Sequence, residues 1–249
     1  MKELGFLGYC VKRKRKRGKG ENSIRIRIGK IVFNILLCFV VLTITPVLFF
    51  KFVNPPTTPL MWIRWIESDT EKKHPLSLNR WVSLENISPN ILKAVIGAED
   101  QKFFKHKGFD WLAIEYAIQT NLTTDRKVGA STISMQTARN VFLWQSRTWL
   151  RKLLEGYFTV SIEFFWSKQR ILEVYVNVIE WGDGLFGCES AAQTYFKHSS
   201  KNMSPVESAW MAAVLPRPRQ WTIRPTPTHV QARQMKILDA LPQIQILYK

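Results

Sequence analysis

The apolar and polar positions divide the chain into one long apolar run and a series of helical segments. Residues 31–50, between Lys30 and Lys51, are mostly apolar and carry no charge. A helix needs about 20 such residues to span a bilayer. We therefore expect one transmembrane helix over 31–52, with Pro46 tolerated inside it. A cleaved signal peptide is the alternative, but its apolar region would hold only about 7–15 residues and end at a small-residue site, which this run lacks.

Helical signals dominate after residue 80. Ser88-Pro89 is typical of an N-cap followed by proline at the first helical position. Ser204 and Glu207 have the spacing of a capping box. A stripe with helical spacing is formed by Ile171, Val174, Tyr175 and Val178. No series of alternating strands is evident, so we predict a mostly α domain.

The chain is expected to contain one folded domain and an anchor. At 249 residues with 46% hydrophobic composition, it can bury one good-sized core. Residues 53–80 are rich in Pro, Thr and charge, as in a linker. The predicted organisation is a basic tail over 1–30, a transmembrane helix over 31–52, a linker over 53–80 and the folded domain over 81–249.

Much of the net charge of +17 lies before the apolar run. Residues 1–30 hold eleven Lys or Arg against Glu3 and Glu21, a net charge of +9. Basic residues directly before a span stay on the cytoplasmic side, so we expect a cytoplasmic amino terminus and an external folded domain. The basic tail is also suited to anionic lipid headgroups. Nucleic acid binding and a solvated tail are the weaker alternatives.

Cysteine and histidine give little indication of a metal or disulfide. Only Cys188 lies in the folded domain, and the histidines are scattered. His106 precedes Gly108, and we interpret it as a structural hydrogen-bonding residue at a turn in preference to a catalytic base.

Two carboxylates stand out. Glu99 continues the apolar helical face of Leu92 and Ile96, and burial there would raise its pKa toward that of a general base or acid at neutral pH. A capping or ion-paired carboxylate is the alternative. Glu155 follows a basic cluster suited to a diphosphate, although Arg151 to Glu155 is also the helical i, i+4 spacing of a plain surface ion pair.

Four blocks in this order carry a family resemblance. They are Glu99-Asp100-Gln101-Lys102-Phe103 with His106 and Gly108, the stretch Gly129 to Asn140, Arg151-Lys152-Leu153-Leu154-Glu155, and Lys168 with Ile171-Leu172-Glu173, Tyr175 and Asn177. From about Trp81 to Pro218 the chain resembles the peptidoglycan glycosyltransferases of family 51, which link lipid II disaccharides into glycan strands. The resemblance implies a lysozyme-like fold with two lobes. Residues 111–118 would belong to a small mobile lobe that closes over the substrate, with ordinary core packing as the alternative.

The resemblance also implies roles for individual residues. Glu99 would deprotonate the acceptor's 4-hydroxyl, which attacks the donor's anomeric carbon with inversion to give a β-1,4 link. Glu155 would be the second catalytic carboxylate, helping the diphosphate leave directly or through a divalent cation, Mg²⁺ or Mn²⁺. The implied substrate-binding residues are Asp100, Phe103, Ser131, Thr132, Gln136, Arg139, Asn140, Arg147, Arg151 and Lys152. The sequence departs from the common family pattern at Ser134-Met135, where Thr-Gln is frequent, and at Arg139, where Lys is frequent. The first departure puts a sugar contact from Met135 in doubt.

The remaining expectations follow from this resemblance. The partners would be lipid II, the growing glycan strand, membrane lipids and candidate cell-wall synthesis and division proteins, with no nucleic acid and no organic cofactor. The location would be the cell inner membrane, crossed once, with a periplasmic catalytic domain. We expect no transpeptidase activity, because Ser-x-x-Lys and Lys-Thr-Gly are absent. A glycan-cleaving lysozyme or lytic transglycosylase, and an inactive anchored scaffold, are the rival interpretations.

Overall fold

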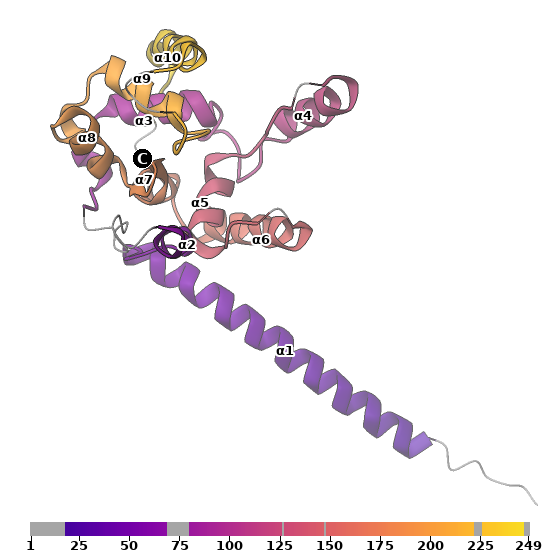
Figure 1. The fold of residues 1–249 in the computed structure, drawn as a ribbon. Helices are drawn as coiled ribbons and strands as arrows, with labels where there is room; N and C mark the ends of the chain where they lie inside the picture. Colours follow the sequence, from indigo (N-terminus) through magenta and orange to yellow (C-terminus); the bar gives the residue numbers. More distant parts are fainter. Residues whose placement is uncertain (1–17, 69–79, 126, 147, 222–225, 247–249) are drawn as a thin grey trace, which may run out of the picture. The chain divides into compact units, whose positions relative to one another are not determined.

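A computed structural model describes residues 18–68, 80–125, 127–146, 148–221 and 226–246 (Figure 1). These residues divide into two compact units, the first ending at Pro46 and the second beginning at Val47. The predicted basic tail lies mostly outside the described residues.

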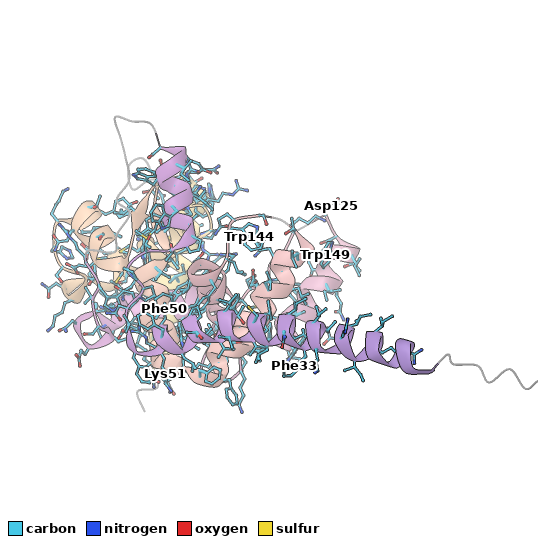
Figure 2. The ribbon with its side chains drawn as sticks, turned by 90° about the horizontal axis from the view of Figure 1, so that it is seen from below. Phe33, Phe50, Lys51, Asp125, Trp144 and Trp149 are labelled. Carbon is cyan, nitrogen blue, oxygen red and sulfur yellow. The ribbon has the colours of Figure 1, made fainter. Side chains whose placement is uncertain are left out.

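The first unit is formed by most of helix α1, which runs from Gly18 to Phe52. Within it, Ile24–Phe52 is long and apolar enough to cross a membrane. The helix begins before the predicted start at residue 31, because Ile24, Ile26 and Ile28 extend the apolar sequence among basic residues. Large apolar side chains project from it into solvent, among them Phe33, which is 63% exposed (Figure 2). A lipid environment would remove this exposed surface from water, so the helix is consistent with the predicted membrane anchor.

The second unit is mostly helical, which confirms the predicted fold class. Its helices are α2 (Pro59–Glu67), α3 (Pro89–Glu99), α4 (Trp111–Thr123), α5 (Ile133–Phe142), α6 (Trp149–Phe165), α7 (Lys168–Val178), α8 (Cys188–Phe196), α9 (Pro205–Val214) and α10 (Thr228–Ala240). Short 3₁₀ turns occur at Leu84–Asn86, Ser200–Asn202 and Leu241–Gln243. An antiparallel hairpin of β1 (Glu180–Gly182) and β2 (Leu185–Phe186) follows α7.

The core forms around α7 and α9, most of whose residues are buried. Helix α5 packs against both α6 and α7, while α3 packs against α9 and α10. The predicted helix starts are confirmed: the Ser88 hydroxyl accepts a hydrogen bond from Asn90 N, and Ser204 with Glu207 forms a complete capping box. These caps fix where α3 and α9 begin, and α3 then ends at Glu99.

The segment predicted as a linker contains helix α2, capped by Thr58. Leu60 and Met61 are buried, and the Arg64 guanidinium donates to both carboxylate oxygens of Glu180 at 3.1–3.2 Å. The proline and threonine that suggested a linker are in fact the start signals of a short helix. Part of this segment is therefore packed against the domain.

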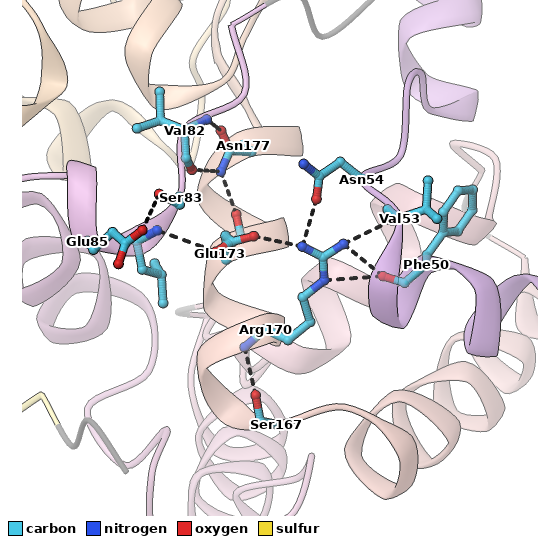
Figure 3. A network of polar contacts seen from close by, with 11 residues as sticks. Phe50, Val53, Asn54, Val82, Ser83, Glu85, Ser167, Arg170, Glu173 and Asn177 are labelled. Carbon is cyan, nitrogen blue, oxygen red and sulfur yellow. Dashed lines mark hydrogen bonds and ion pairs between the residues drawn. The ribbon is translucent and has the colours of Figure 1, made fainter.

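Arg170 of α7 joins the last turn of α1 to the domain (Figure 3). Its guanidinium donates hydrogen bonds to Phe50 O, Val53 O and Asn54 Oδ1 at 2.8–3.2 Å, and pairs with Glu173 at 2.7 Å. Carbonyl groups at a helix end lack intrahelical partners. Arg170 supplies those partners from a helix 120 residues away in sequence.

The same helix face holds the segment that enters the domain. Asn177 accepts from Val82 N at 3.0 Å and donates to Val82 O at 2.8 Å, and Glu173 accepts from Leu84 N (Figure 3). Glu173 and Asn177, both in the fourth motif, thus support the scaffold.

Helices α4 and α6 present large apolar side chains to solvent. Only Ala117 of α4 is buried, whereas Trp111 is 70% and Leu122 81% exposed. On α6, Trp149 is 90% and Phe164 80% exposed. Figure 1 shows α4 extending away from α3, α9 and α10. Ordinary core packing, one of the two predicted explanations for residues 111–118, is therefore wrong.

Candidate active site

Glu99 is the last residue of α3, at the end of a helix whose apolar face enters the core. Ile91, Leu92, Val95 and Ile96 are all at most 1% exposed. This packing places the Glu99 side chain, which is 15% exposed, at the edge of the core. The predicted position on an apolar face is confirmed.

Both carboxylate oxygens of Glu99 have partners. Oε1 accepts from Arg233 Nη2 of α10 at 3.0 Å, and Oε2 accepts from Gln136 Nε2 of α5 at 2.9 Å. Burial raises the pKa of Glu99, and neighbouring Asp100 adds to this, while Gln136, Arg233 and Arg139 oppose it. The balance leaves the pKa above its ordinary value, which suits a group that takes up a proton near neutral pH.

Tyr175 of α7 orients the Gln136 amide. Its hydroxyl donates to Gln136 Oε1 at 3.1 Å, so the amide NH₂ must face Glu99. Burial and the charge of Glu99 raise the pKa of Tyr175 well above its ordinary value, so the phenol keeps the proton that it donates. The two hydrogen bonds, from Tyr175 to Gln136 and from Gln136 to Glu99, therefore hold the Glu99 carboxylate in place.

Asp100 and His106 stabilise the turn after Glu99. The Asp100 carboxylate lies 2.9 and 3.0 Å from His106 Nε2 and accepts from Ile133 N at the start of α5. Gly108 has φ +92°, and a Cβ there would lie 2.9 Å from Thr159 Cγ2. The structural role predicted for His106 agrees with these contacts, because they join the end of α3 to α5 and α6.

Phe103, predicted to line the sugars, is placed differently. Its side chain is 0% exposed, and Lys168 Nζ lies 4.5 Å from the ring centroid. Lys168 also pairs with Glu163, which accepts from the Ser134 hydroxyl. A cation held over an aromatic ring in a desolvated site stabilises the packing. Phe103 is thus a core residue in this structure, because the turn after Glu99 directs it inward.

The second motif lies beside Glu99 and divides between two pockets. One pocket is lined by Glu99, Asp100, Ser131 and Thr132. The Thr132 hydroxyl is already used, because it donates to Gly108 O at 2.6 Å and caps α5.

The other pocket is lined by Gln136, Arg139, Asn140 and Tyr175, together with Arg64 of α2 and Glu180. In the described part of the chain, buried Arg139 Nε has no hydrogen-bond partner. Glu99 lines the first pocket and Gln136 lines the second, so the hydrogen bond between these two side chains links the walls of the two pockets.

Glu155 lies on α6 with its side chain 1% exposed, paired with both Arg151 and Lys152. The ion pair between Arg151 and Glu155 forms at the predicted helical spacing, but the predicted plain surface pair is wrong, because the carboxylate is buried and has Lys152 as a second partner. Two cations share one carboxylate, so the cluster keeps a net positive charge. Arg147, predicted to bind the diphosphate, lies outside the described residues.

A metal site made only of protein side chains does not emerge from the described residues, where no three His, Cys, Asp or Glu side chains group so as to hold an ion. The carboxylate of Glu155 is occupied by its two basic partners.

Two contacts at the candidate site are not predicted by the sequence. Arg233 lies beyond the last recognised motif, and its distance of 134 positions from Glu99 leaves no local signal. The pair of Arg64 and Glu180 joins segments 116 positions apart. Both contacts depend on tertiary packing.

Comparison with known proteins places this arrangement in a family. The family model described as Transglycosylase matches residues 70–242. The biosynthetic peptidoglycan transglycosylase of Bdellovibrio bacteriovorus is 49% identical over 212 residues, 85% of each chain. Proteins of the same name from Xanthomonas oryzae and Caulobacter vibrioides are 46% identical over 202 residues (81% of this chain and 82% of the relative) and 43% identical over 214 residues (84% and 91%). The chain therefore belongs to the transglycosylase family, a family of peptidoglycan glycosyltransferases, as its four motifs predict.

Proposed function

We propose that this enzyme polymerises lipid II into linear β-1,4 glycan strands, with inversion at the anomeric carbon and without transpeptidase activity. The observation that carries the proposal is the position of Glu99, a partly buried carboxylate of raised pKa that lines one polar pocket and accepts a hydrogen bond from Gln136, which lines a second. Glycosyl transfer brings two sugars together at one base. Two pockets whose walls are joined by the hydrogen bond between Glu99 and Gln136 are suited to that need.

In the proposed reaction, Glu99 takes the proton of the acceptor's 4-hydroxyl. The hydroxyl oxygen forms a bond to C1 of the donor, and the bond from C1 to the phosphate oxygen breaks. The diphosphate leaves with the electron pair. Each carboxylate oxygen of Glu99 has one further lone pair beyond its present hydrogen bond, so it can accept this proton.

Glu155, Arg151 and Lys152 would stabilise the leaving diphosphate. The proposal rests on their net positive charge and on the fit of guanidinium donors to phosphate oxygens. Arg139, with its unpartnered Nε in the described structure, would contribute a third cation, one that acts on Glu99. Ser131, Gln136 and Asn140 remain the proposed sugar-binding side chains, since all three line the pockets.

A divalent cation remains a proposal. Mg²⁺ is commonly held by one or two carboxylates together with substrate phosphates, so an ion bound largely by the diphosphate is compatible with the side chains described. No step above depends on it.

The membrane supplies the lipid substrate in this proposal. Helix α1 would anchor the chain, and the exposed apolar side chains of α4 and α6 would contact lipid. The growing strand and membrane lipids are the proposed partners, and cell-wall synthesis and division proteins remain candidates.

Orientation is tested by reporters on either side of α1. A phosphatase that is active only when exported should be active when fused after Lys249, because the basic tail keeps the amino terminus cytoplasmic. The same phosphatase joined after residue 30, with the rest of the chain removed, should be inactive. The reverse pattern in stable fusions would contradict the proposed periplasmic domain.

The proposed reaction is tested with the purified full chain and labelled lipid II. We expect a polymer that muramidase digests to disaccharide peptides without cross-linked fragments. If the diphosphate-bound cation is correct, EDTA should abolish polymerisation, and Mg²⁺ or Mn²⁺ should restore it. Cross-linked products would contradict the absence of transpeptidase activity. Cleavage of existing strands without polymerisation would indicate a lytic enzyme.

A further inference from the structure

Arg233 is the one cation that donates directly to Glu99 among the described residues. We propose that Arg233 is a positioning residue that keeps the catalytic carboxylate ionised and correctly directed. This inference rests on the proposed role of Glu99 as the base and adds a residue outside the four motifs.

Arg233 is held on the packed face of α10. Val230 and Ile237, three positions before it and four after it, are 0% and 5% exposed. Residues with this spacing share one face of a helix, and α10 packs against both α9 and α3. The guanidinium therefore reaches the end of α3 from a fixed backbone.

The end of α3 is a place where a carboxylate needs such a partner. The negative end of the helix dipole lies there, and Asp100 adds a second negative group next to Glu99. Arg233 Nη2 donates to Ala98 O at 3.2 Å as well as to Glu99 Oε1 at 3.0 Å. One side chain thus offsets both the partial negative charge at the end of α3 and the negative charge of the Glu99 carboxylate.

The other groups around Glu99 act through different contacts. Gln136 donates a neutral hydrogen bond, Tyr175 orients Gln136, and Arg139 contributes positive charge without a direct hydrogen bond to the carboxylate. Burial raises the pKa of Glu99, and Arg233 and Arg139 are the cations that oppose it. Loss of Arg233 would therefore raise this pKa further, leaving less of the base ionised at neutral pH.

The direction of the pH effect follows from this argument. A base is active when ionised, so kcat/KM falls as pH drops below the pKa of Glu99. Removing an opposite charge within hydrogen-bonding distance moves such a pKa by about 1–3 pH units. For Arg233→Met we expect the acid limb of kcat/KM to move up by about 1 pH unit, with roughly tenfold lower activity on that limb and recovery at higher pH.

The experiment compares four folded variants of the full chain in the lipid II assay across pH. Arg233→Met and Arg233→Gln both remove the charge. Gln also retains a hydrogen-bond donor, so this variant can test the effect of charge if Arg233→Met does not fold. Arg233→Lys keeps the charge and should keep the acid limb close to that of the wild type. Lys236→Met removes a cation from an exposed position of the same helix and is the matched control.

A shift in both charge-removing variants, absent from Arg233→Lys and Lys236→Met, would support the proposal. Equal loss of activity at every pH would mean a merely structural role and overturn it, as would an equal shift in Lys236→Met.

Glu99→Gln, measured in parallel, separates this inference from the proposed function. If Glu99→Gln is inactive while the Arg233 variants keep the wild-type profile, only the role of Arg233 fails. An active Glu99→Gln protein would instead remove the base itself.

Discussion

Glu99→Gln is expected to lower the rate of lipid II polymerisation by about 10²–10⁴-fold, the usual contribution of general acid–base catalysis. The amide keeps the size of the side chain and can still accept from Gln136 or Arg233, but it cannot take up the acceptor's proton. Binding of lipid II or of a phosphoglycolipid inhibitor should survive, because the cluster proposed to bind the diphosphate lies on a different helix, α6. Single-turnover rates and inhibitor affinity measure the two effects separately.

The control for this variant is Glu85→Gln, which removes a carboxylate from an exposed 3₁₀ turn before α3. It should polymerise at the normal rate, since Glu85 contacts only Ser83 among its described hydrogen bonds. Near-normal turnover by a folded Glu99→Gln protein would refute the mechanism. That result would instead favour an inactive anchored scaffold, for which Glu99 carries no chemistry.

Local signals predicted much of this fold. The starts of α3 and α9 were visible because a capping side chain and its proline or glutamate lie within four positions of each other. Glu99 was predictable as an edge-of-core carboxylate because helical spacing relates it to Leu92 and Ile96. These features could be predicted because the contacts that determine them lie within one helix, where spacing along the sequence gives position.

The features that the sequence did not predict depend on tertiary contacts. Phe103 belongs to the first motif, yet the turn directs its ring beneath Lys168, 65 positions later. The segment holding α2 has the composition of a linker, but its docking depends on Glu180. Arg233 reaches Glu99 only because α10 packs on α3. None of these partners can be identified from spacing alone.

Glu155→Gln is expected to separate binding from turnover. In the wild type, the carboxylate is 1% exposed and neutralises part of the charge of Arg151 and Lys152. Without it, the two cations face an amide, and their uncompensated charge should bind a diphosphate more tightly. Turnover should fall by about 10²–10³-fold, as when one preorganised electrostatic group is removed from an active site. We therefore expect lower kcat together with higher affinity for a phosphoglycolipid inhibitor.

Stability must be measured beside affinity, because breaking a buried ion pair costs about 3–5 kcal/mol. We expect a smaller loss here, since the Lys152 side chain is 42% exposed and water can solvate it. Glu163→Gln is the matched variant: it removes another buried carboxylate from α6, one paired with Lys168. Both variants should unfold at lower denaturant concentration, but only Glu155→Gln should bind the inhibitor more tightly. Weaker inhibitor binding by a folded Glu155→Gln protein would mean that the carboxylate orients the two cations more than it neutralises them. An equal gain in affinity for Glu163→Gln would remove the diphosphate cluster from the proposal.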